Sequence, residues 1–158
     1  MKKKLLPAVL AFCLLLSACA QNREDVSAAA LAGSLKENLS ATGTLLQADD
    51  DFFLLNFPDA PAPAERAVYY SGAAPTTEYG VFRMENEKDA AEMEEAVRAY
   101  LDTEKESRVS LARLYPTEDS SEDCSRFENA LLGRRGKTVF YFVGDSADVT
   151  TARNILES

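Results

Sequence analysis

Apolar and polar residues follow two periods along this chain, and the longer period marks helices. In three stretches the apolar residues recur every three or four positions, which predicts amphipathic helices. The first covers residues 26–39, the second begins after Asn86, and the third begins after Asp145 or Ser146. Asn86 is a suitable N-cap, and Pro116 ends the second helix, because proline disfavours a helical conformation in the preceding residue.

Four shorter runs are rich in β-branched and aromatic residues and are bounded by turn-forming residues, so they predict strands. They form two β-hairpins, with turns at 72–77 and 133–136. The last run contains the sequence TVFYFV, which is apolar on both alternating faces. This predicts a central strand, covered by helices on one side and by loops or the first helix on the other. The four predicted strands are residues 67–71, 78–85, 127–132 and 137–143.

The remaining segments have weaker patterns. Residues 44–57 are apolar apart from three aspartates at 49–51, and they predict a short helix or an irregular segment. Residues 117–125 are acidic and polar, which predicts a surface loop. Together the elements predict an α+β fold, in which a four-stranded, mainly antiparallel sheet of two β-hairpins has helices packed on it and is preceded by an N-terminal helix.

The first residues have the layout of a secretory signal peptide. Lysines at positions 2–4 precede an apolar run over residues 5–16, and small residues follow this run. As a helix the run is roughly 18 Å long, whereas the hydrocarbon core of a bilayer is roughly 30 Å thick. The run is therefore too short to span a membrane.

The apolar run ends in a motif that resembles a bacterial lipobox: Leu16, Ser17, Ala18 and Cys19. The resemblance implies that residues 1–18 are a lipoprotein signal peptide and that Cys19 carries a diacylglyceryl group. Two acyl chains supply the stable anchoring that one chain does not. The predicted location is the outer face of the cytoplasmic membrane, with residues 19–25 as a short tether. An ordinary signal peptide cleaved near Ala18, or an uncleaved anchor, is the alternative.

Length and charge limit the classes of function. Cleavage after residue 18 leaves 140 of the 158 residues, which is enough for one domain, predicted at 26–158. Cleavage also removes three lysines and no acid, so that 14 basic and 26 acidic residues give a mature net charge of −12. Such a charge disfavours binding to nucleic acid and to an anionic lipid surface. Nucleic acid is therefore not an expected partner.

The residue types exclude several kinds of catalysis. The chain contains no histidine, so a Ser-His-Asp triad, a Cys-His dyad and a His-ligated zinc site are excluded. Cys124 lies among acidic residues that oppose a thiolate, which favours an incidental thiol over a nucleophile. The aspartates at 49–51 lack the alternating spacing of a calcium loop. No catalytic residue, metal site or cofactor is predicted.

Two charged clusters are candidates for a site. The acids within 118–123 are candidate paired carboxylates for glycoside hydrolysis, although acid runs are common in polar loops and the chain has no tryptophan for sugar stacking. Arg134, Arg135 and Lys137 lie at the tip of the second hairpin and are a candidate contact for a partner or a lipid headgroup. Basic residues at a hairpin end more often only keep the edge soluble. Four tyrosines are expected in the core and in cross-strand pairs rather than in a ligand cage: Tyr69, Tyr70, Tyr79 and Tyr141.

Several short motifs occur in a fixed order after the lipobox: a strand pair that carries Glu78 and ends in VFRME, EKES at 104–107, Tyr115-Pro116, Glu128-Asn129-Ala130, Gly136 and an apolar strand. In this order, and over residues 66–156, the chain resembles a family of small bacterial lipoproteins known as domain of unknown function 4358. The resemblance implies a lipid-anchored envelope protein of a Gram-positive, Clostridia-like bacterium, and it assigns no activity and no catalytic residues. The alanine- and proline-rich connector at 58–64 departs from the family pattern.

These observations favour a non-catalytic binding or interaction module at the membrane surface, whose partner is an envelope protein or an unidentified ligand. Two alternatives are a small envelope hydrolase that uses the carboxylates at 118–123 and a structural envelope component. A concave pocket lined by converging acids would favour the hydrolase, whereas a flat face with exposed tyrosine or phenylalanine would favour binding. Stable multimers would favour the structural component.

Overall fold

The computed structural model describes residues 26–40 and 44–158. Its helices are α2 (Ala28–Asn38), α3 (Asp50–Asn56), α4 (Glu87–Leu114), α5 (Glu118–Glu128) and α6 (Ser146–Leu156). Its strands are β1 (Leu45–Gln47), β2 (Glu65–Ser71), β3 (Glu78–Arg83), β4 (Leu131–Arg135) and β5 (Thr138–Val143).

The three predicted amphipathic helices are present as α2, α4 and α6, and the local sequence explains where each begins. Ser27, Asn86 and Asp145 are the N-caps, and each side chain accepts a hydrogen bond from a backbone N–H of the first turn. α4 ends at Leu114, two residues before Pro116. The predicted start and end of the longest helix are therefore confirmed.

The strands form one antiparallel sheet in the order β1-β2-β3-β5-β4. The α+β class is confirmed, and so are the two hairpins, β2–β3 and β4–β5. The predicted number of four strands is wrong, because β1 adds a fifth strand at one edge by pairing with the end of β2. β1 has three residues, of which only Leu45 is even partly buried, so its own pattern does not predict a strand. Its pairing with β2 makes it one.

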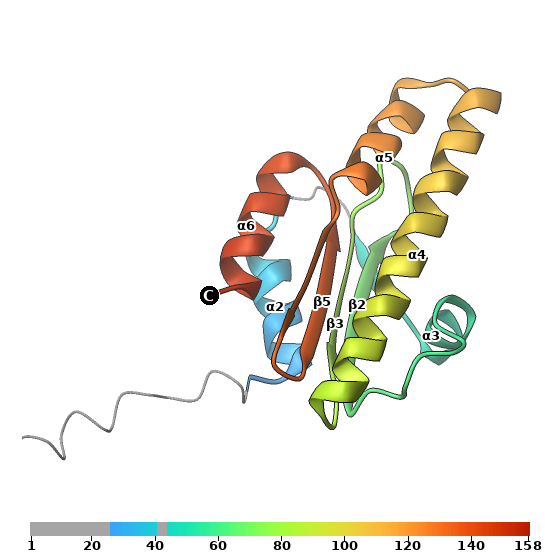
Figure 1. Ribbon diagram of the computed structural model, residues 1–158. Coiled ribbons are helices and arrows are strands. Elements are labelled where there is room, and N and C mark those ends of the chain that lie inside the picture. Colours follow the sequence, from blue (N-terminus) through green and yellow to red (C-terminus); the bar gives the residue numbers. More distant parts are fainter. Residues whose placement is uncertain (1–25, 41–43) are drawn as a thin grey trace, which may run out of the picture.

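Helices cover both faces of the sheet, as Figure 1 shows. α3, α4 and α5 pack on one face, and α2 and α6 pack on the other. β5 lies between β3 and β4, which confirms the predicted interior strand. Its side chains alternate between two apolar cores, so every residue of TVFYFV is buried. Val139, Tyr141 and Val143 belong to the core under α4, and Phe140 and Phe142 belong to the core under α2 and α6.

The predicted surface loop at 117–125 is wrong, because most of it is the helix α5. Thr117 caps this helix and forms a capping box with Ser120. Serine and aspartate favour caps and turns over helix interiors, so the composition alone predicts a loop. The helix is stabilised by its packing on α4, which buries Asp123 and Phe127.

The predicted bounds of the third strand are also wrong, because its first residues belong to α5. The prediction places it at 127–132, but α5 continues to Glu128 and β4 occupies Leu131–Arg135. Phe127 fits either a strand or the apolar face of a helix, and the contact with α4 decides between them.

The predicted signal peptide at 1–18 and the tether at 19–25 lie outside the described residues, and so do Leu16, Ser17, Ala18 and Cys19. Among the helices of residues 26–40 and 44–158, none combines the length and the apolar character needed to cross a membrane.

Candidate functional site

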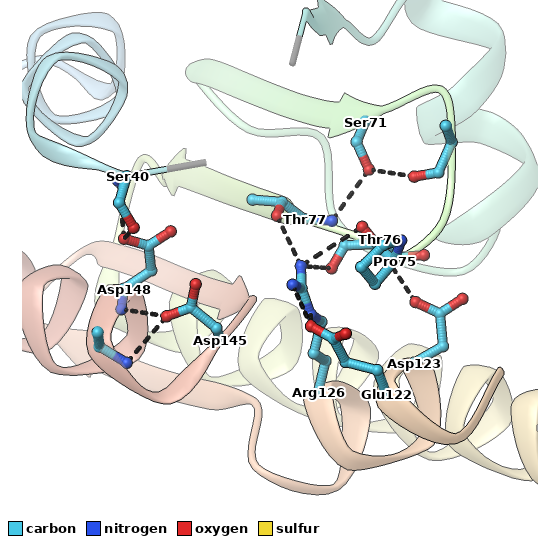
Figure 2. A network of polar contacts seen from close by, with 12 residues as sticks. Ser40, Ser71, Pro75, Thr76, Thr77, Glu122, Asp123, Arg126, Asp145 and Asp148 are labelled. Carbon is cyan, nitrogen blue, oxygen red and sulfur yellow. Dashed lines mark hydrogen bonds and ion pairs between the residues drawn. The ribbon is translucent and has the colours of Figure 1, made fainter. Parts of the chain in front are cut away.

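The turn between β2 and β3, residues 72–77, is held in place by side chains of α5 (Figure 2). The backbone N–H of Thr76 donates a hydrogen bond of 2.5 Å to the carboxylate of Asp123. Arg126 donates from Nη1 to the carbonyl oxygen of Thr76 and to the hydroxyl of Thr77, each at 3.0 Å. Asp123 and Arg126 are both largely buried, with side-chain exposures of 7% and 12%. Two charged residues of a helix therefore fix the position of a turn that has no charge of its own.

Further contacts within the network make the turn rigid. Glu122 accepts hydrogen bonds from Nε and Nη2 of Arg126, so it orients the guanidinium. The hydroxyl of Ser71 accepts a hydrogen bond from the N–H of Thr77 and donates one to the carbonyl oxygen of Ala73. Because both sides of the turn are bonded, the surfaces next to it are preorganised.

A pocket of about 340 Å³ lies between this turn, α3 and α4. We call it the turn pocket. Besides turn residues, it is lined by three aromatic and three charged side chains: Phe52, Tyr70, Tyr100, Glu78, Glu104 and Arg108.

Glu78 is the most deeply buried charged residue of the turn pocket, with an exposure of 5%. The hydroxyl groups of Tyr100 and Tyr141 both donate hydrogen bonds to its Oε1, at 2.8 and 2.5 Å. Its Oε2 accepts no hydrogen bond from the residues that the structure describes. Within residues 26–40 and 44–158, Nε of Arg108 is the only side-chain polar atom that is both fully buried and without a hydrogen-bond partner. Oε2 of Glu78 also has no partner, so it is not fully buried and keeps some contact with solvent.

The environment of Glu78 favours its protonated form. Burial raises the pKa of this carboxyl group above 4.5, although the hydrogen bonds from Tyr141 and Tyr100 oppose the shift. The negative charge of Glu104 raises the pKa further, and the positive charge of Arg108 lowers it. Burial and the nearby Glu78 also raise the pKa of both tyrosine hydroxyls, which therefore remain protonated donors.

Gly80 makes room for the ring that reaches Glu78. It pairs with Tyr141 across β3 and β5. A Cβ atom at position 80 would lie 2.4 Å from Cε1 of Tyr141, so a larger residue would displace the ring. Because alternate residues of a strand share a face, the ring over Gly80 places its hydroxyl next to Glu78.

Arg108 links the turn pocket to the network that holds the turn. Its Nη2 is 2.9 Å from Oε2 of Glu104, and its Nη1 is 3.6 Å from Oδ2 of Asp123. The guanidinium also lies over the ring of Phe127, 5.1 Å from its centroid. The positive charge of Arg108 is therefore shared between two carboxylates.

A second hollow, of about 420 Å³, lies on the other side of the turn. Its lining includes Ser40, Thr44, Arg126 and Asp145, and Figure 2 shows that nearby Asp148 accepts hydrogen bonds from Ser40. Arg126 is committed to Glu122 and to the turn, and Ser40 and Thr44 flank residues outside the described part of the chain. The turn pocket is therefore the better-defined candidate.

The acids predicted as a hydrolytic pair are not gathered at a pocket. They lie along α5, where Glu122 pairs with Arg126 and Asp123 binds the turn, and neither these two nor Glu118 and Asp119 line the two hollows next to the turn. The aspartates at 49–51 begin α3, with Asp49 as its N-cap. The described residues contain no group of three or more acids or cysteines placed to hold a metal ion.

The predicted turn at 133–136 is wrong in its bounds, because β4 continues to Arg135 and the turn is formed by residues 136–137. Arg134 and Arg135 therefore end β4, and Lys137 lies in the turn; we call these three residues and Gly136 the basic turn. Gly136 has a positive φ of 54°, which suits glycine at this turn. Arg134 forms an ion pair of 2.9 Å with Glu94 of α4, and Lys137 is exposed. None of these residues lines the turn pocket or the second hollow.

Two other surface features do not by themselves define a binding or catalytic site. Cys124 is a half-buried free thiol on α5. The end of α4 exposes Leu114 and Tyr115, at 72% and 69%. Exposed apolar side chains at a helix end are compatible with protein contact, but nothing in the described residues shows what covers them.

The charged residues of the turn pocket are not among the candidate site residues that the sequence predicts, although Glu78 and the EKES run at 104–107 belong to the motifs of the family resemblance. A signal was present on α4, where Tyr100, Glu104 and Arg108 recur every four residues and so share one face of the helix. Glu78 carries no such signal, because an acid at the start of an apolar strand is expected at a solvated strand end.

The chain matches no protein-family model, and neither the curated proteins nor the solved structures give a match. The resemblance to domain of unknown function 4358 therefore stays a prediction. The candidate site rests on its own contacts.

Proposed function

We propose that this chain is a binding module without catalysis of its own, held at the outer face of the cytoplasmic membrane by a lipid on Cys19. The observation that carries the binding role is the turn pocket. Its walls are fixed before any ligand arrives, because Asp123 and Arg126 hold the turn and Tyr100 and Tyr141 hold Glu78. Preorganised walls favour binding, since less conformational freedom is lost when a ligand enters.

The position of the pocket suits a protein anchored by its N-terminus. Ala28, at the start of α2, donates a hydrogen bond from its backbone N–H to Glu65 at the beginning of β2. Glu78 lies beside Tyr70, near the other end of β2. Five residues of strand span roughly 17 Å, so the pocket lies near the end of the sheet that is distant from Ala28.

Binding is favoured over hydrolysis because one oxygen of each acid in the pocket already has a partner within the chain, which holds the acid in a fixed position. Oε1 of Glu78 accepts two tyrosine hydroxyls, and Glu104 is paired with Arg108. A general acid and base need to exchange protons with a substrate, which these contacts oppose.

A small hydrolase is a second candidate, supported by one specific observation. Glu78 and Glu104 line the same pocket, and burial raises the pKa of Glu78, as in a general acid. In this second candidate function the catalytic acids are Glu78 and Glu104, not the carboxylates at 118–123.

The proposal is tested by photo-cross-linking in the native host cells. A photoreactive residue at Ala73, an exposed residue of the turn pocket, is compared with one at Lys137 in the basic turn. We expect a discrete set of adducts from position 73 and none from position 137. We also expect Cys19→Ala to abolish fatty-acid labelling and to reduce the adducts, whereas Cys124→Ser should change neither.

Three results would contradict the proposal. Adducts from position 137 alone would move the contact to the basic turn, and adducts between copies of this chain alone would favour a structural component. Unchanged fatty-acid labelling of Cys19→Ala would remove the lipid anchor.

A further inference from the structure

We infer that the turn pocket binds the ammonium group of a small organic amine, with Oε2 of Glu78 and the carboxylate of Glu104 as the groups that recognise its charge. The inference rests on the proposed binding function and adds the class of ligand. A volume of about 340 Å³ suits a small molecule rather than a folded partner.

The first support is the unused half of the Glu78 carboxyl group. Tyr100 and Tyr141 both donate to Oε1, and Oε2 accepts no hydrogen bond from any described residue while keeping some contact with solvent. Buried polar atoms are nearly always paired, so an accessible oxygen on a residue that lines a pocket is suited to a donor from outside. An ammonium group offers three such donors.

The second support is the aromatic lining. The rings of Phe52 and Tyr70 are stacked, with centroids 5.5 Å apart, and the ring of Tyr100 meets Phe52 edge to face at 6.5 Å. These three rings come from α3, β2 and α4 and line the same pocket. Aromatic rings attract an organic cation through their π-electrons and contact its methylene groups at the same time.

The third support is the charge balance. Among the described residues that line the turn pocket, Arg108 is the only basic one, and its guanidinium contacts Glu104 and Asp123. An anionic ligand would meet the carboxylates of the pocket and would have to compete with them for Arg108. A cationic ligand would neutralise them, and the acidic chain attracts cations from a distance.

Binding of an ammonium group should release a proton. The charged and titratable groups that face Glu78 are Glu104, Arg108 and Tyr100 of α4 and Tyr141 of β5, and burial keeps Glu78 protonated to a higher pH than usual. When the cation arrives, the Glu78 proton leaves to solvent and the carboxylate pairs with the ammonium. Affinity should therefore increase with pH while Glu78 is still partly protonated.

The test is calorimetric titration of the full chain in detergent with three matched probes. The probes are 1,5-diaminopentane, which is cationic, 1,5-pentanediol, which is neutral, and glutarate, which is anionic. We expect saturable binding of the diamine, with a Kd of about 1 mM or below, and binding of the diol and of glutarate at least about tenfold weaker. Titration in two buffers of different ionisation enthalpy should show proton release only with the diamine.

Variants locate the binding. Glu78→Gln and Glu104→Gln should each weaken diamine binding at least about tenfold, because each removes a negative charge next to the ammonium. Glu106→Gln is the matched control, since Glu106 is an exposed acid of the same helix outside the pocket, and its affinity should be unchanged. Circular dichroism melting curves show whether each variant is folded.

The ammonium inference is overturned if the diamine shows no saturable binding at 10 mM, if the diol or glutarate binds as tightly, or if Glu78→Gln and Glu104→Gln both keep the native affinity. If position 73 is cross-linked in cells while the diamine does not bind, the ammonium inference fails and the binding function stands.

Discussion

The two hairpins of the sheet differ in charge and in the pockets beside their turns, and the more charged hairpin is not the one next to the turn pocket. Arg134 and Arg135 end β4 and Lys137 lies in the β4–β5 turn, whereas the β2–β3 turn at 72–77 carries no charged residue. The turns lie at opposite ends of the sheet, because Glu78 pairs with Val143 at one end and Arg83 pairs with Thr138 at the other. The uncharged turn nevertheless borders the pocket with the buried acid.

The difference lies in what surrounds each turn. Arg126 and Asp123 of α5 reach the uncharged turn, and Glu104 and Arg108 of α4 lie in the pocket beside it. At the basic turn, Arg134 forms a partly exposed ion pair with Glu94 of α4. The candidate site is formed by side chains that converge from several elements, and none of its charged residues lies in the turn itself.

The largest effect should come from removing the residue that pins the uncharged turn. Asp123→Ala leaves the buried N–H of Thr76 without its acceptor and removes one partner of Arg108. We expect a loss of about 2 kcal/mol in the free energy of unfolding, measured by urea denaturation. Asp123→Asn keeps an acceptor for Thr76 and should lose less, and Asp119→Ala, an exposed acid of the same helix, is the control. Equal stability of Asp123→Ala and Asp119→Ala would show that the turn is not pinned by α5.

Glu78→Gln should cause a smaller change, a gain on the order of 1 kcal/mol or less in the free energy of unfolding at pH 7. The native protein binds the Glu78 proton more tightly than the unfolded chain does, so this residue favours folding at low pH and loses that contribution as pH rises above 4.5. Glutamine does not titrate and keeps an acceptor for both tyrosines. The variant should therefore be at least as stable as the wild type at pH 7, and this advantage should disappear below about pH 4.5. Urea denaturation at several pH values measures it, and parallel stability curves for the two proteins would argue against a buried, titrating Glu78.

The smallest effect should come from the basic turn. The ion pair between Arg134 and Glu94 is partly exposed, at 34% and 25%, so Arg134→Ala should cost about 0.5 kcal/mol or less. The loss should shrink further in high salt, because screening weakens exposed pairs. A loss as large as that of Asp123→Ala would show that the two turns contribute equally to stability, against the expected difference between them.

Much of the fold could be predicted because periodicity is a local property. The longest helix could be predicted from its apolar stripe, the Asn86 cap and Pro116. The interior strand β5 could be predicted because it is apolar on both faces, and a strand buried on both faces needs such a pattern. The segments that could not be predicted, β1 and α5, have weak patterns of their own, and pairing with β2 and packing on α4 determine their structure.

The amino-acid sequence alone was enough to predict the α+β class, the Asn86 cap of the longest helix and the two hairpins, and its lack of histidine excludes histidine chemistry. These follow from residue types and from spacings of a few positions along the chain. It is the tertiary structure that brings Phe52, Glu78 and Arg108 to one pocket, because they are far apart in the chain and lie on α3, β3 and α4. Their shared position depends on which helix covers which face of the sheet, and that choice is made by burial and by hydrogen bonds between distant residues.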